Sequence, residues 1–157
     1  MFDQFSDRAR MVAFSARLVA GDQGAKEIGN EHLLEAIIRE DAPTRLLLFS
    51  NDSTTHELLA ELNPLGPSRD SIHAVDMLRQ QSTTLKPAQA ADMPISSGLG
   101  RTLNEAVALG NDLRSRNIEP LHLLAAIIRC DTDICERLNH HGVRLDAVVA
   151  AIRSSGQ

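Results

Sequence analysis

Residues 28–39 read IGNEHLLEAIIR, and residues 118–129 read IEPLHLLAAIIR. The second stretch repeats the first at a shift of 90 positions, which aligns His122 with His32. In both stretches the apolar residues form a wide stripe at helical spacing, so each stretch predicts an amphipathic helix with a buried face. The rest of the chain is organised around this pair.

The same shift of 90 positions aligns small and apolar residues well beyond the two stretches, as a structural repeat requires. Aligned pairs include Ala9 with Leu99, Ala16 with Ala106, Leu48 with Leu138 and Leu58 with Val148. We therefore predict one domain over residues 1–157, made of two related repeats. The first repeat covers residues 5–62, the second covers residues 95–152, and residues 63–94 connect them.

Each repeat is predicted to contain four helices, because Gly, Pro, Asn and Asp mark every short connection. In the first repeat, Ser6 or Asp7 caps the first helix, Asn30 caps a second over residues 31–40, and Pro43 opens a third. In the second repeat, the helices are expected over residues 97–113, from Pro120, over 133–139 and over 146–153. The predicted fold is all-α, with the two repeats sharing a core about a pseudo-twofold axis.

The connection between the repeats has two parts. Residues 68–81 carry a moderate helical pattern of apolar residues, whereas residues 82–94 are polar, contain two prolines and are expected to form a flexible loop.

Composition narrows the class of protein. The chain of 157 residues has a net charge of −5 and only 3% aromatic residues, so its core must be aliphatic. The basic residues are scattered among acids, which does not support a nucleic-acid partner. The N-terminal residues lack the apolar run of a signal peptide, and no apolar run is long enough to span a bilayer. We expect a cytoplasmic protein with no membrane partner.

The sequence contains no recognisable catalytic motif. A phosphate-binding G-x-x-x-x-G-K-[ST] loop is absent, and residues 98–100 (GLG) lack the third glycine of a dinucleotide-binding motif. No serine lies in a G-x-S-x-G elbow. We therefore expect a protein that is not an enzyme and that needs no cofactor.

Two groups of residues could in principle bind a metal. His32 and His122 occupy matching positions at the start of the repeated helix, where each could be a ligand or a base, or could satisfy local backbone groups. We predict the second, structural role, because no carboxylate or thiol pattern accompanies both histidines. Cys130 and Cys135, with His140 and His141, could form a zinc set, but the spacing of five points the two sulfurs to different helix faces. Free thiols and no metal site are expected.

Three residues of the first repeat are candidates for partner binding. Glu31 and Glu35 lie early in the repeated helix, where a carboxylate also favours the helix dipole without any binding role. Phe2 stands next to the N-terminus, where it either packs on the core or is exposed as a hydrophobic contact.

Three motifs resemble the N-terminal double repeat of the Clp family of AAA+ unfoldases, especially the ClpC type. They are FDQFSDRA over residues 2–9, IGNEHLL over residues 28–34 and NHHGV over residues 139–143. The resemblance implies an eight-helix module that receives adaptors and substrates for an ATPase ring. In ClpC-type members the glutamate of each G-T-E-H motif meets the guanidinium of phosphoarginine, a degradation mark.

Transferred by position, this role falls on Glu31 in the first repeat. Leu121 holds the matching position of the second repeat and Glu119 lies two residues out of register, so a second pocket is expected to be absent. Phe2 matches an exposed residue that contributes to a peptide-like ligand site in ClpC-type domains. The family's ATPase module is not found in these residues.

These observations favour a non-enzymatic protein-binding module of a Clp chaperone or protease system. Its partners would be Clp unfoldase or protease subunits, adaptors or substrates. One alternative is the substrate-receiving N-terminal domain of a full-length ClpC-, ClpA- or ClpB-type ATPase. Another is a small-molecule or metal-binding helical sensor.

Overall fold

The computed structural model describes residues 2–48, 52–62 and 93–155. These residues form eight α-helices and a short 3-10 helix. The first repeat contains η1 (Phe2–Gln4), α1 (Asp7–Asp22), α2 (Asn30–Glu40), α3 (Ala42–Leu48) and α4 (Asp52–Leu62). The second repeat contains α7 (Ser97–Asp112), α8 (Pro120–Cys130), α9 (Thr132–His140) and α10 (Leu145–Ser155). The described residues contain isolated β-bridges but no strand, so the all-α prediction is confirmed.

The first helix of each repeat begins at a serine cap. Ser6 Oγ accepts a hydrogen bond from the Ala9 N–H at 3.1 Å, and Ser96 Oγ accepts one from the Leu99 N–H at 3.0 Å. Each serine has extended backbone, as an N-cap requires.

The predicted cap of the second helix was wrong. Gly29 is the N-cap residue of α2, and Asn30 is the first residue of the helix. The Asn30 side chain instead reaches the other repeat, where its Nδ2 donates to Asp131 Oδ2 at 3.3 Å. A cap is not needed from Asn30 because His32 satisfies the backbone at this helix start.

The two repeats exchange equivalent contacts. Phe5 forms a parallel bridge with Ile118, and Ile28 forms one with Ile95. Since Ile95 aligns with Phe5 and Ile118 aligns with Ile28, each repeat gives the other the contact that it receives. Reciprocal contacts of this kind are expected when two similar units are related by a twofold axis.

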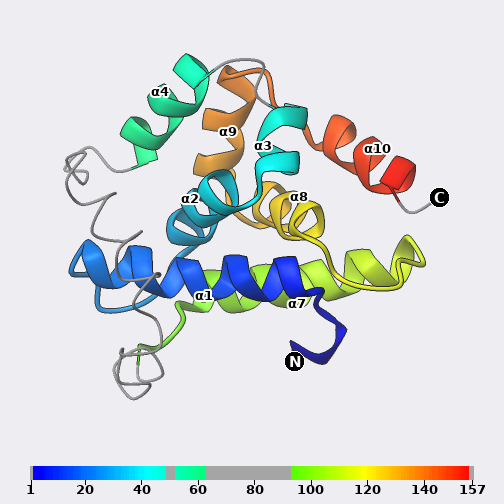
Figure 1. The fold of residues 1–157 in the computed structure, drawn as a ribbon, viewed down its shortest axis with the longest axis horizontal. Helices are drawn as coiled ribbons and strands as arrows, with labels where there is room; N and C mark the ends of the chain where they lie inside the picture. Colours follow the sequence, from blue (N-terminus) through cyan, green and yellow to red (C-terminus); the bar gives the residue numbers. More distant parts are fainter. Residues whose placement is uncertain (1, 49–51, 63–92, 156–157) are drawn as a thin grey trace.

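The core lies between α2 and α8, which contact each other. In Figure 1, α1 and α7 run in opposite directions along the lower edge, and α2 and α8 lie above them. Leu33, Leu34 and Ile37 of α2 are at most 1% exposed, as are Leu123, Leu124 and Ile127 of α8. The repeated stretches therefore supply the centre of an aliphatic core, as their periodicity predicts.

The last helix of the first repeat is tied to the second repeat. Arg137 of α9 donates a hydrogen bond to the carbonyl oxygen of Glu61, at the end of α4. The Glu61 carboxylate also lies 3.0 Å from His141 Nε2. In Figure 1, α4 accordingly lies beside α9.

Residues 63–92 lie outside the described residues. The helical pattern predicted over residues 68–81 and most of the flexible loop predicted over residues 82–94 therefore fall outside them as well.

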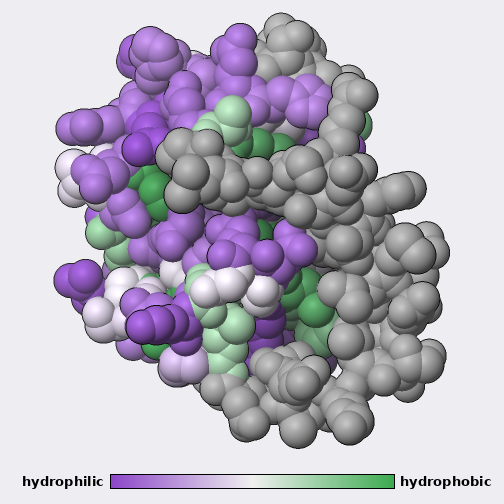
Figure 2. Space-filling model, turned by 90° about the vertical axis from the view of Figure 1, so that its left-hand side faces the viewer, coloured by the Kyte–Doolittle hydropathy of each residue, from purple (hydrophilic) through white to green (hydrophobic). Residues whose placement is uncertain are grey.

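Figure 2 shows one side of the molecule, on which most coloured atoms belong to hydrophilic residues, with smaller hydrophobic areas between them. Within the described part of the chain, none of the helices combines the length and hydrophobicity that crossing a membrane requires.

Candidate functional site

The start of α2 is built by both repeats. The Ile28 N–H donates to the Pro94 carbonyl at 2.9 Å, and the Ile28 carbonyl accepts from the Ser96 N–H at 2.8 Å. These bonds clamp the residues before α2 against the segment that leads into α7. Glu31, at the second position of α2, is therefore presented close to the junction of the repeats.

His32 fixes the backbone at this helix start. Its Nδ1 accepts the Gly29 N–H at 2.8 Å, and its Nε2 lies 3.1 Å from Gln23 Oε1. Because Nδ1 acts as an acceptor, the ring is neutral and carries its proton on Nε2, which donates to Gln23. Burial lowers the pKa of His32, against the opposing effect of the Glu31 carboxylate. Both ring nitrogens are thus used inside the protein.

His122 repeats this arrangement in the second repeat. Its Nδ1 accepts the Glu119 N–H at 2.9 Å, and its Nε2 lies 2.8 Å from Ser115 Oγ. Burial lowers the pKa of His122, while the charge of Glu119 and its backbone hydrogen bond act in the opposite direction. Each imidazole therefore satisfies a local backbone N–H at the start of a buried helix.

Glu31 presents its carboxylate at the surface. Its side chain is 48% exposed, and Oε1 lies 3.8 Å from His32 Nδ1. A Cβ added at Gly29 would lie 2.6 Å from both carboxylate oxygens of Glu31, so the acid folds back over the bare backbone of Gly29. The N-terminal end of α2 favours a negative charge in this place. Within the described residues, the Glu31 carboxylate has no Lys or Arg partner.

Asn30 adds a second oxygen near this helix start. The residue is only 6% exposed, and its Oδ1 has no hydrogen-bond partner among the described residues. A buried acceptor without a donor is costly to the stability of the fold. The Asn30 oxygen lies inside the protein, so of these two consecutive residues only Glu31 presents its side-chain oxygens at the surface.

Glu35 lies inside the protein, not on its surface. Its side chain is 3% exposed and forms an ion pair with Arg39, while Gln23 Nε2 donates to its Oε2 at 2.9 Å. Burial raises the pKa of Glu35; Arg39 and Gln23 lower it, and Asp22 raises it further. Through Gln23 the carboxylate is connected to His32, so Glu35 can support the helix start, and its carboxylate does not reach the surface.

Phe2 begins η1, directly before the first long helix. The position of its side chain lies outside the described part of the structure, so the expected role of Phe2 stays a prediction.

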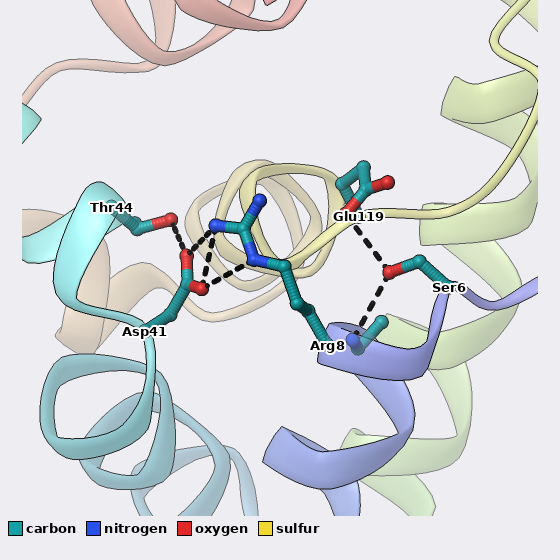
Figure 3. Close-up of polar contacts among 6 residues, drawn as sticks. Ser6, Arg8, Asp41, Thr44 and Glu119 are labelled. Atoms are coloured by element: carbon teal, nitrogen blue, oxygen red, sulfur yellow. Dashed lines mark hydrogen bonds and ion pairs between the residues drawn. The ribbon is translucent and has the colours of Figure 1, made fainter.

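The matching position in the second repeat is different. Leu121 replaces the acid and packs, partly buried, against the hydrophobic core. Glu119, two residues earlier, accepts a hydrogen bond from Ser6 Oγ of the first repeat at 2.9 Å. Figure 3 shows this contact at the start of α1.

Sequence reasoning missed an ion pair next to this contact. Arg8 donates to Asp41 through Nε at 2.9 Å and through Nη2 at 2.6 and 2.8 Å, and Thr44 Oγ1 also donates to Asp41. Figure 3 shows Arg8 reaching from α1 to the corner between α2 and α3. The aspartate repeats as Asp131, but position 98 of the second repeat is Gly where the first has Arg8, so the repeat gave no signal for the pair.

The candidate zinc residues have other contacts. Cys130 and Cys135 are free, partly buried thiols, and Cys135 Sγ accepts from Asn139 Nδ2 at 3.6 Å. His141 contacts Glu61 of α4, and His140 lies edge to face against His141. In the described ranges no group of three or more His, Cys, Asp or Glu side chains is placed to hold a metal ion.

Comparison with known proteins gives one family and several similar folds. Residues 4–141 match the family described as "Clp repeat (R) N-terminal domain". The structure is similar to the N-terminal domain of the caseinolytic protease associated chaperone ClpD from Arabidopsis thaliana, with a TM-score of 0.70, 19% identity and 100% of each chain covered. It is also similar to the Hsp104 N-terminal domain from Candida albicans, with a TM-score of 0.56, 19% identity, and 94% of this chain and 88% of that chain covered. A search of curated proteins finds no match.

Proposed function

The chain belongs to the Clp repeat (R) N-terminal domain family, and on this premise we propose that it is a non-enzymatic module that binds proteins for a Clp chaperone or protease system. Its partners are substrates, adaptors or subunits of the Clp machine. Residues 1–157 act as one unit in this proposal, with the repeats over residues 5–62 and 95–152 joined by residues 63–94.

One observation carries the choice of binding site: the Glu31 carboxylate is half-exposed and lacks a cationic partner among the described residues. A guanidinium carries five N–H donors in a planar fork and binds carboxylates strongly. The proposed ligand is therefore an arginine-bearing protein segment, with phosphoarginine as the form that the family resemblance implies.

The proposal assigns one such site to the chain, not two. Leu121 offers no charge at the matching position of the second repeat, and Glu119 is already bonded to Ser6. Glu35 and His32 act as supporting residues, since they hold the helix start that presents Glu31. Phe2 remains a proposed hydrophobic contact for the same partner.

The proposed function can belong to two kinds of protein, and the extent of the coding sequence distinguishes them. If the coding sequence extends beyond Gln157 into an ATPase, the chain is the substrate-receiving domain of that enzyme. If it stops there, the chain is an accessory or adaptor protein. The binding site proposed at Glu31 is the same in both.

The test is a titration of the 157-residue protein with a labelled peptide that carries phosphoarginine. Glu31→Ala is expected to weaken binding by at least about tenfold, because the guanidinium loses its carboxylate. Glu27→Ala is the matched control, since Glu27 is an exposed acid just before α2, and it is expected to bind as the wild type does. Circular dichroism verifies that both variants remain folded. Equal affinities of the wild type and Glu31→Ala would refute the site.

A further inference from the structure

The outer face of α1 carries two exposed hydrophobic side chains. Met11 is 55% exposed and Phe14 is 38% exposed. They lie three residues apart on one helix, so they are neighbours on its surface. Arg101 and Asn104 occupy the aligned positions of α7, and both are exposed.

The second repeat shows that the fold does not require hydrophobic residues here. The α7 helix presents polar residues at these positions, and it still packs on α8 as α1 packs on α2. Met11 and Phe14 are therefore not needed to build the repeat. Exposed hydrophobic side chains that the fold does not require are candidates for contact with a partner where polar residues surround them.

Two arginines flank the hydrophobic pair. Arg10 and Arg17 lie four residues before and three residues after Phe14, so Arg10, Phe14 and Arg17 follow one helix face. The exposed Asp7 lies 3.8 Å from Arg10 at the N-terminal end of this face. Gly100 and Val107 occupy the two arginine positions in the second repeat, whose aligned face carries Arg101 as its basic residue. The combination of a hydrophobic pair with two flanking arginines therefore belongs to the first repeat alone.

We propose that Arg10, Met11, Phe14 and Arg17, the α1 surface, dock an acidic amphipathic segment of a partner protein. The hydrophobic side chains of the segment pack on Met11 and Phe14, and its carboxylates meet Arg10 and Arg17. This inference rests on the proposed protein-binding function, but it uses none of the residues at the start of α2. An anionic membrane is the other surface that such a face could meet, and vesicles of anionic lipid test that alternative.

The α3 helix supplies a matched control. Leu46 and Leu47 are 73% and 57% exposed, and the second repeat has Glu136 and Arg137 in their place. Leu46→Glu/Leu47→Arg therefore changes an exposed hydrophobic pair to the residues of the other repeat, as Met11→Arg/Phe14→Asn does on α1. Both double variants are expected to fold, because the second repeat carries these residues at the same positions. Phe14→Ala provides a milder change.

The test uses fluorescence anisotropy with a labelled synthetic peptide of leucines at helical spacing flanked by glutamates. We expect the wild type to bind it, Met11→Arg/Phe14→Asn to lose at least about tenfold in affinity, and the α3 variant to bind normally. Phe14→Ala should lose part of the affinity. A peptide with lysines in place of the glutamates should not bind, and added salt should weaken the acidic peptide.

Several results would overturn the proposal. They are absence of binding to the wild type, equal affinity for Met11→Arg/Phe14→Asn, equal loss in the α3 variant, or binding to phosphatidylglycerol vesicles but not to the peptide. Because the phosphoarginine titration depends on Glu31 and this one on α1, failure of the α1 surface leaves the Glu31 site independently testable.

Discussion

Phe5 and Ile118 lie 113 positions apart in the sequence and form a parallel β-bridge between the two repeats. The Ile118 N–H donates to the Gln4 carbonyl at 2.7 Å, and the Ile118 carbonyl accepts from the Ser6 N–H at 3.0 Å. Ile28 is held in the same manner by Pro94 and Ser96. The start of the central helix in each repeat is therefore held in place by the other repeat.

This exchange predicts a single cooperative thermal transition. Neither central helix can keep its hydrogen-bonded start or its buried face if the other repeat unfolds. Differential scanning calorimetry should therefore give one peak with equal calorimetric and van't Hoff enthalpies. Two separated peaks would contradict a shared core.

His122→Gln is expected to reduce the dependence of stability on pH. The pKa of His122 is lowered in the folded protein, so below about pH 6.5 the unfolded chain binds more protons than the native state. Neutral His122 therefore makes its full contribution to the free energy of unfolding above this pH. The contribution is lost as the pH drops through the pKa of the unfolded state and then through that of the folded state.

Urea denaturation at pH 7.5 and 5.5 checks this prediction. The wild type should lose more stability than His122→Gln between the two values, and His32 contributes equally to both proteins. His56→Gln is the control, because His56 is exposed on α4 and should behave as the wild type does. An unchanged pH dependence in His122→Gln would show that the imidazole titrates normally in the folded state.

Glu35→Ala is expected to destabilise the protein by about 3 kcal/mol, because it leaves the largely buried guanidinium of Arg39 without its carboxylate. Glu35→Ala/Arg39→Met should recover a substantial part of this loss, since no buried charge then remains unpaired. Chemical denaturation of the three proteins measures the difference. If the double variant is less stable than Glu35→Ala, the ion pair is not the reason for the loss.

The sequence predicted the fold well because the fold depends on local patterns. Apolar spacing, a cap at Ser6 or Asp7, and Pro120 place the helices, and the repeat adds the twofold relation. These signals lie within a few residues of the element that they determine, so they can be read without knowledge of distant contacts.

The site was predicted less completely because its side chains are placed by distant partners. Asn30 was expected to cap its own helix, but it reaches Asp131 of the other repeat. Glu35 was grouped with Glu31 as a candidate for partner binding, yet Gln23, directly after α1, and Arg39 hold it inside. The local sequence pattern carries no signal for a contact whose partner is brought near only by tertiary packing.

The central claim is that the chain binds proteins of a Clp system, and affinity capture tests it most directly. The tagged 157-residue protein is incubated with lysate of its own host, and captured proteins are identified by mass spectrometry against a tag-only control. The account predicts enrichment of Clp ATPase or protease subunits, adaptors or clients, reduced for clients by Glu31→Ala. Capture of none of these classes above the control would contradict it.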